Sequence, residues 1–192
     1  NTVTSELYDG KKGIKIIPCY YKKDYPEWSD RGDGPGAPVA VHLPNSPVIT
    51  TGKRDGSKIR LPNGNYLEET ASYYVMIETK TGGYTPALIT MKSTQLNVSK
   101  KWNSMMKTIQ IPDGKGGFAI PPMHGVVYNL ASTLQKNDKG SWYGWVVTQD
   151  RILGQKDKSL YLEAKDFSGN VSKGNVQTKA DVEEKAKDST PY

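Results

Sequence analysis

The stretch Ser93-Thr-Gln-Leu-Asn-Val-Ser-Lys-Lys-Trp-Asn-Ser-Met-Met-Lys107 contains the clearest helix in the sequence, and its position decides the fold class. Apolar side chains recur every three or four residues along it, at Val98, Trp102, Met105 and Ile109. This is the period of an apolar helix face, so Trp102 is expected in the core. Ser93 is a residue type that caps helix N-termini, which predicts a helix over residues 94–107.

The residues before this helix have the composition of β-strands. Residues 14–21 mix β-branched and aromatic side chains, and Pro18 within them favours an edge position or a bulge. Residues 73–79 are the strongest candidate for a central strand, with residues 86–91 as its neighbour. One of Tyr73 and Tyr74 is then expected to face solvent, because they point to opposite faces. Shorter strands are predicted at residues 39–43, 48–50 and 58–61.

The residues after the helix predict a β-hairpin. Residues 126–135 alternate, residues 136–140 form a five-residue loop, and residues 141–148 return. Leu160, Leu162 and Phe167 suggest one more short strand.

Strands, one helix and then a hairpin is the element order of a partly open antiparallel β-barrel of the OB type. The predicted fold is therefore mainly β, an OB-like barrel with one α-helix, and the alternative is a β-sandwich with one helix. Residues 1–172 are expected to form this single domain, and residues 173–192 a flexible polar C-terminal tail.

The composition favours a polyanionic partner. The 192 residues carry 26 Lys and Arg against 20 Asp and Glu, a net charge of +6, although a solvated Lys-rich surface has the same signature. A single cysteine excludes an internal disulfide framework, and no apolar stretch reaches the roughly 18 residues that span a bilayer. The chain starts with Asn, which predicts that it begins inside a longer gene product. The expectation is an intracellular, soluble domain that does not contact membranes.

No motif predicts catalysis, so the protein is not expected to be an enzyme or to need a cofactor or a metal. His42 and His124 lie far apart, no His/Cys cluster has zinc-site spacing, and Cys19 is expected to be a buried structural thiol. The alternative is a metal-dependent nuclease that uses the acids near Trp28, namely Asp24, Glu27, Asp30 and Asp33.

Aromatic residues recur beside basic ones, which is the combination that single-stranded nucleic-acid binders need for base stacking and phosphate contacts. On the predicted hairpin, Trp142 points to one side and Tyr143 and Trp145 to the other. A large ring should therefore be left outside unless a second layer covers it. The candidate nucleic-acid-binding residues are Tyr20, Tyr21, Lys22, Lys23, Trp28, Arg31, Lys53, Arg54, Lys58, Arg60, Lys100, Lys101, Trp142, Tyr143 and Trp145.

Three phrases together resemble a group of tailed-phage proteins, some of them labelled single-stranded DNA-binding. They are Pro18-Cys-Tyr-Tyr21 with Glu27-Trp28 and Arg31, then Lys92-Ser-Thr-Gln-Leu96 with Lys101-Trp-Asn103, and Asn137-Asp-Lys-Gly-Ser-Trp-Tyr-Gly-Trp145. The similarity spans about residues 1–150, and it implies a phage source and a role beside replication or recombination.

These observations lead to two main hypotheses of function. The first is a phage protein that binds single-stranded DNA without sequence preference, in the cytoplasm of the infected host, and that contacts replication or recombination enzymes through its C-terminal tail. The second is a virion structural protein, such as a capsid decoration or tail component. A homo-oligomer is compatible with both hypotheses.

Overall fold

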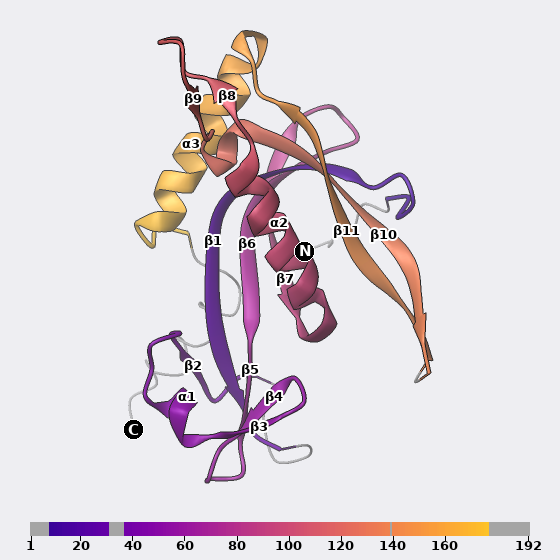
Figure 1. The fold of residues 1–192 in the computed structure, drawn as a ribbon, viewed down its shortest axis with the longest axis vertical. Coiled ribbons are helices and arrows are strands. Elements are labelled where there is room, and N and C mark those ends of the chain that lie inside the picture. Colours follow the sequence, from indigo (N-terminus) through magenta and orange to yellow (C-terminus); the bar gives the residue numbers. More distant parts are fainter. Residues whose placement is uncertain (1–7, 31–36, 139, 177–192) are drawn as a thin grey trace, which may run out of the picture.

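The computed structural model describes residues 8–30, 37–138 and 140–176, and this part of the chain is mainly β, as predicted (Figure 1). Its strands pair antiparallel and are β1 (Ile14–Trp28), β2 (Ala40–His42), β3 (Lys53–Asp55), β4 (Lys58–Arg60), β5 (Tyr66–Glu68), β6 (Thr70–Glu78), β7 (Tyr84–Lys92), β8 (Ile111–Pro112), β9 (Phe118–Ala119), β10 (Val126–Asn137) and β11 (Gly140–Ile152). The helices are α1 (Val48–Thr51), α2 (Leu96–Thr108) and α3 (Lys158–Ser172), with 3₁₀ turns η1 (Ser93–Gln95), η2 (Met123–Gly125) and η3 (Gln155–Asp157).

The long strand β1 joins two parts of one sheet. Its first residues pair with β10 and β6, which gives a main part ordered β11-β10-β1-β6-β7. Its last residues pair with β2 and β5, which gives a lower part ordered β2-β1-β5-β4-β3. The register of β1 against β6 shifts between Pro18 and Tyr20, so the bulge predicted at Pro18 is confirmed.

The main part curls around α2, which lies in the hollow between the β6–β7 side and the β10–β11 side (Figure 1). This is the half-open antiparallel barrel with a helix that the element order predicts. The helix begins after the short turn η1, in which Ser93 adopts a φ of 52°. The prediction that Ser93 caps the helix is wrong, because the turn places Gln95 at the N-cap position of α2.

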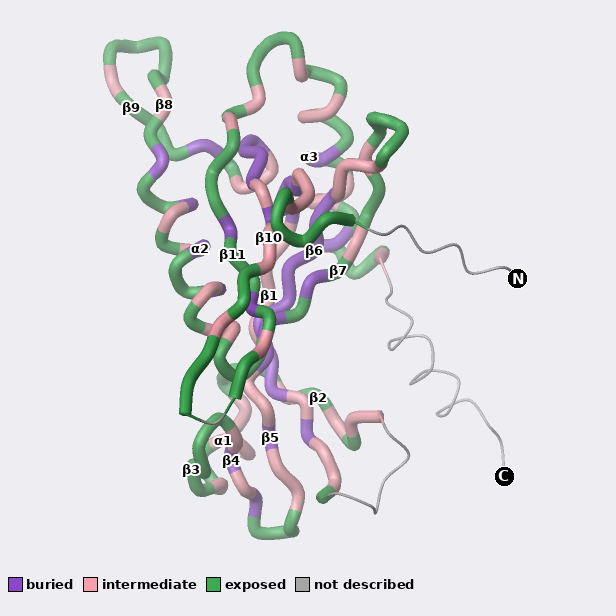
Figure 2. Tube along the Cα trace, turned by 90° about the vertical axis from the view of Figure 1, so that its right-hand side faces the viewer, coloured by how far each residue is buried: buried purple, intermediate pink, exposed green. Residues whose placement is uncertain are grey.

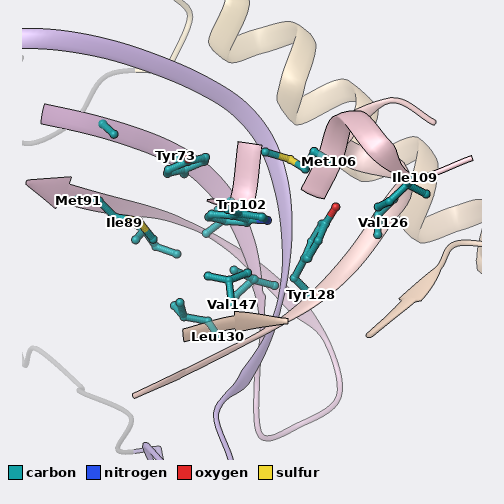
Figure 3. Packing of buried hydrophobic residues seen from close by; sticks show 13 residues of the cluster. Tyr73, Ile89, Met91, Trp102, Met106, Ile109, Val126, Tyr128, Leu130 and Val147 are labelled. Carbon is teal, nitrogen blue, oxygen red and sulfur yellow. The ribbon is translucent and has the colours of Figure 1, made fainter. Parts of the chain in front are cut away.

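Trp102 forms the centre of the main core (Figure 3). Its ring stacks on Tyr73 with centroids 4.3 Å apart, and it meets Tyr128 edge to face at 5.6 Å. Trp102 is 1% exposed, so its predicted core position is confirmed. Tyr73 and Tyr74 are both buried, and the prediction that one faces solvent is wrong. The helix covers Tyr73, while Tyr20 packs against Tyr74 at 6.1 Å.

The opposite face of the main part is covered by α3. Ala164 packs there against Ile17 and Met76, with Leu160 and Phe167 beside it. The last short strand predicted here is therefore wrong, and the fold has a second long helix. The apolar residues recur at helical spacings of four, three and four, at Leu160, Ala164, Phe167 and Val171.

A smaller core supports the lower part of the sheet. It contains Tyr25, Ile59, Leu61 and Leu67, against which Val48 and Ile49 of α1 pack. The strand predicted at residues 48–50 is wrong, because these residues form a single helical turn that covers the inner face of the lower sheet.

Strands β10 and β11 form the predicted hairpin, and they pair up to Asn137 opposite Gly140, so the loop is shorter than five residues. The far end of this hairpin projects from the body (Figure 1), and most of this projecting end is exposed (Figure 2).

Cys19 is buried, as predicted. In the part of the chain that the structure describes, no helix combines the length and apolar character needed to cross a membrane. Helix α3 ends at Ser172, and residues 177–192 of the predicted tail lie outside the described residues.

Candidate nucleic-acid interface

Four of the lower strands place one aromatic or basic side chain each in a single row. Trp28 of β1 lies opposite Tyr66 of β5, Tyr66 lies opposite Arg60 of β4, and Arg60 lies opposite Lys53 of β3. Directly opposed residues of antiparallel strands share a face of the sheet. Lys58 belongs to the same face, because it is two residues from Arg60 along β4. We call Trp28, Tyr66, Arg60, Lys53 and Lys58 the aromatic–cationic row.

The cations of this face lie close to its rings. The Nζ atom of Lys58 is 3.6 Å from the ring centroid of Tyr66, and the guanidinium carbon of Arg60 is 5.5 Å from it. Lys92, at the end of β7, extends its Nζ to 6.0 Å from the centroid of Trp28. The surface therefore combines two half-exposed rings with lysines that lie over their faces. Rings and cations together are what binding of unpaired bases and phosphates requires.

Carboxylates partly balance these cations through exposed ion pairs. Arg60 contacts Asp30 at 3.2 Å and Asp55 at 3.6 Å, and these two acids raise the pKa of the guanidinium, with Asp30 the main cause. Lys92 donates to Glu68 at 2.9 Å. The side chains of Asp30 and Asp55 are more than half exposed, so their ion pairs are worth little, and a phosphate can replace them.

The segment after Lys92 leads from this face to the β10–β11 hairpin. Thr94 shares a pocket of about 230 Å³ with Asn137, Gly140, Ser141 and Trp142. The next residue, Gln95, accepts a hydrogen bond from the backbone N–H of Trp145 at 3.2 Å. The segment from Lys92 to Gln95 thus approaches Trp28 at its first residue and the β10–β11 hairpin at its last two.

The two sides of the hairpin strand have different surroundings. Trp142 is half-buried and lines the pocket beside Thr94, whereas Tyr143 is 70% exposed and Trp145 37% exposed. The alternation thus leaves large rings outside, as predicted, and they are Tyr143 and Trp145.

The remaining candidate residues do not join this surface. Tyr21 packs on Tyr73 at 4.9 Å, and Tyr20 packs on Tyr74, so both rings serve the core. Lys23 pairs with Glu69 at 2.7 Å, which raises the pKa of the lysine, and Lys22 contacts Asp24 at 3.3 Å. The others lie elsewhere: Lys100 and Lys101 are exposed on α2, Arg54 is on the face opposite Lys53, and Arg31 is outside the described residues.

Sequence reasoning missed two residues of this surface, Tyr66 and Lys92. The signal for Tyr66 was present, because the turn Pro62-Asn-Gly64 follows a strand and should be followed by its return strand. That return strand is β5, which carries Tyr66. No comparable signal marks Lys92, whose position beside Trp28 depends on how β7 ends.

The acids near Trp28 are engaged by protein side chains. Glu27 is buried, and its Oε1 accepts hydrogen bonds from Asn65 at 2.6 Å and Asn63 at 3.2 Å, while Oε2 meets Nε2 of His42 at 2.7 Å. These partners, Asn65 first, lower the pKa of Glu27. Among residues 8–30, 37–138 and 140–176, no three His, Cys, Asp or Glu side chains gather as a metal ion would require. Asp33 is outside those ranges.

Comparison with known protein families gives a match over most of the chain. The model of the family described as Pam3 phage gp34-like protein matches residues 1–177 of this chain. No curated protein and no solved structure matches it.

Proposed function

Since the chain belongs to the Pam3 phage gp34-like family, we propose that this phage protein binds single-stranded DNA without sequence preference during replication or recombination of the phage genome. The observation that carries the proposal is the aromatic–cationic row, which lies on the face of the lower sheet opposite the one that α1 covers. OB-type domains bind nucleic acid across such a sheet face, with rings for the bases and cations for the backbone.

The positions of the residues in the aromatic–cationic row predict the path of a single DNA strand on the protein. Bases stack on Trp28 and Tyr66, and the lysines that now lie over these rings move aside to meet phosphates. The DNA strand then continues past Lys92 toward Trp142, along the connection that Thr94 and Gln95 form. Stacking accepts every base because each has a π-face, and phosphate contacts carry no sequence information, so the binding is non-specific.

Replacing a ring of the row should weaken binding at every salt concentration. Tyr66→Ala and Trp28→Ala should each cost about 1–3 kcal/mol in the affinity for labelled oligo-dT, measured by fluorescence anisotropy, because each removes one stacking surface. Phe118→Ala is the matched control, since Phe118 is 70% exposed but lies on the β8–β9 hairpin. Equal losses in all three variants, or no loss in any, would rule out the row as the stacking surface.

Replacing a cation should change the salt dependence instead. Lys58→Gln and Lys92→Gln should each flatten the slope of log K against log salt by about 0.7, because one phosphate contact is lost. The ring variants should keep the wild-type slope. Lys107→Gln, at an exposed lysine in the last turn of α2, is the control. If the ring variants and the lysine variants have the same slope of log K against log salt, the rings and lysines do not have the separate roles in stacking and phosphate contact assigned to them.

A second candidate function is a structural role in the virion, as a decoration or tail component. The projecting β10–β11 hairpin favours it, because exposed apolar side chains on a projecting element mark protein–protein contacts. A protein with that role should bind capsids or tails and ignore free oligonucleotide. Retention on single-stranded DNA cellulose, compared with cosedimentation with phage particles, distinguishes the two functions.

A further inference from the structure

Two hollows share the segment that precedes β1 as a wall. This segment, residues 8–13, lies beside β10, where the N–H of Ser132 donates a hydrogen bond to the carbonyl oxygen of Gly10 at 2.8 Å. One hollow is a groove of about 460 Å³, and the other is a pocket of about 610 Å³. Tyr8 and Gly13 line both, so the groove and the pocket adjoin each other.

The groove offers aromatic surface, and we call it the ring groove. Its second wall consists of Leu130 of β10 with Tyr143 and Trp145 of β11, and both rings are exposed. The charged residue in its lining is Asp9, whose Oδ1 accepts a hydrogen bond from the backbone N–H of Lys11 at 2.9 Å. A flat apolar group can therefore stack in the ring groove without leaving this carboxylate without a donor.

The pocket is lined by more cations than acids, and we call it the lysine pocket. Its lining contains Lys12, Lys15 and Lys80 with Glu78 and Asp150, and Lys15 pairs with Asp150. In the described part of the chain, Lys12 and Lys80 form no ion pair with a carboxylate. These two lysines can meet a phosphate without first breaking an ion pair, so the lysine pocket suits an anion.

Tyr8 brings a ring and a cation together where the two hollows meet. Its hydroxyl donates to the carbonyl oxygen of Glu78 at 3.3 Å, and the Nζ atom of Lys80 lies 5.7 Å from its ring centroid. Rings for bases and cations for phosphates are what a nucleotide chain requires. Tyr8, Lys80 and Tyr143 are exposed, so both hollows are open, whereas a small-molecule site encloses most of its ligand. Open, adjoining hollows suit a chain that passes from one to the other.

We infer that the ring groove and the lysine pocket bind a second stretch of the single DNA strand that binds the aromatic–cationic row. Bases stack on Tyr143 and Trp145, and phosphates contact Lys12 and Lys80. This assignment rests on the proposed function, because the DNA strand arrives from Trp142. Tyr143 is the next residue on β11, the edge strand of the main part of the sheet, so a DNA strand that rounds this edge at Trp142 meets Tyr143.

The length of the DNA separates the two regions. Ile14, at the start of β1, lines the ring groove, and Trp28, at the end of β1, belongs to the row. With 15 residues at about 3.3 Å each, β1 is about 50 Å long. An oligo-dT of about 6 nucleotides then occupies one region alone, whereas one of about 25 nucleotides, beyond the site size of a single OB-type domain, reaches both. Reaching both raises the affinity, because the second contact is intramolecular.

The ratio of the affinities for the long and the short oligonucleotide, measured by fluorescence anisotropy, tests the second site. Tyr143→Ser should lower this ratio at least about fivefold, because a stacking surface for the long oligonucleotide is lost while the row still holds the short one. Phe118→Ser, at an equally exposed ring on the β8–β9 hairpin, should leave the ratio unchanged. Thermal unfolding of each variant shows that the fold is retained.

The outcomes distinguish this second site from the proposed function. An unchanged ratio in Tyr143→Ser, while Trp28→Ala/Tyr66→Ala weakens binding of both oligonucleotides, would overturn the second site and leave the row in place. Absence of binding of either oligonucleotide to the wild type would contradict both. Saturable binding of thymidine monophosphate that Tyr143→Ser abolishes, with an unchanged ratio, would assign the two hollows to a free nucleotide instead.

The salt dependence tests the lysine pocket separately. Lys12→Gln and Lys80→Gln should each flatten the slope of log K against log salt by about 0.7 for the long oligonucleotide, because one phosphate contact is lost. The slope for the short oligonucleotide should not change. Lys107→Gln is the control for both lengths. Slopes that flatten equally for both oligonucleotides, or for neither, would exclude the lysine pocket from the path of the long strand.

Discussion

Trp102→Ala is expected to lower the free energy of unfolding by about 3–5 kcal/mol, the range for removing a large aromatic ring from a core. The indole is 1% exposed and contacts rings from two strands on opposite sides of the curled sheet, Tyr73 of β6 and Tyr128 of β10. Truncation leaves a cavity between α2 and the sheet that neither side can close. Urea unfolding measures the loss.

Two variants of α2 control this prediction. Lys101→Ala changes the neighbouring exposed residue and should have little effect on stability. Trp102→Phe keeps an aromatic ring, and the buried indole N–H that it removes has no hydrogen-bond partner among the described residues, so it should cost much less than Trp102→Ala. A loss below about 1 kcal/mol for Trp102→Ala would show that α2 does not close the barrel, since core truncations cost several times more.

Glu27→Ala should be the second most damaging change, at about 3 kcal/mol, because it leaves buried polar partners without their acceptor. The carboxylate connects β1 with His42 on β2 and with Asn63 and Asn65 in the turn between β4 and β5. Its removal should therefore loosen the lower part of the sheet, which hydrogen exchange would detect there rather than around α2. Glu163→Ala, at an exposed acid of α3, is the matched control.

The contribution of Glu27 to the free energy of unfolding should decrease as the pH falls. The pKa of Glu27 is lowered from its ordinary value of 4.5, so the folded state binds its proton less readily than the unfolded chain. Its stabilising contribution is fully present above pH 4.5 and is lost as the pH falls through the lowered pKa of the folded state. The stability difference between wild type and Glu27→Ala should therefore shrink in acid. A difference that grows in acid would mean that the carboxylate is not the stabilising form.

Local patterns in the sequence predict most of the main sheet and α2. The apolar period around Trp102 predicts the helix and its buried face, and Pro18 predicts the bulge in β1, because both signals depend on neighbouring residues alone. Helix α3 has the same kind of signal, with Leu160, Ala164 and Phe167 at helical spacing, but its polar surroundings favoured a strand and tail interpretation. The error at α1 has another cause. Val48 and Ile49 have strand propensity, and only the small core of the lower sheet makes them a helical turn.

The residue types of the candidate interface could be predicted from the sequence, but which of these residues lie together could not. Aromatic and basic residues could be recognised by composition, but the row requires the register between β1, β5, β4 and β3, which local patterns do not contain. The same applies to His42, which no acidic residue adjoins in the sequence and which contacts Glu27 across a strand pair. Tyr20 and Tyr21 resembled a stacking platform, yet their rings pack against Tyr74 and Tyr73 of β6.

One titration shows whether single-stranded DNA binds to the aromatic–cationic row. Wild-type protein and the double variant Trp28→Ala/Tyr66→Ala are titrated with fluorescein-labelled oligo-dT at about 50 mM salt, where phosphate contacts are strongest. We expect saturable binding with quenched tryptophan emission in the wild type. The affinity of the double variant should fall by about 2–6 kcal/mol, the sum of two stacking losses. Absence of binding and quenching in the wild type, or a double variant that binds as tightly, would contradict binding to the row.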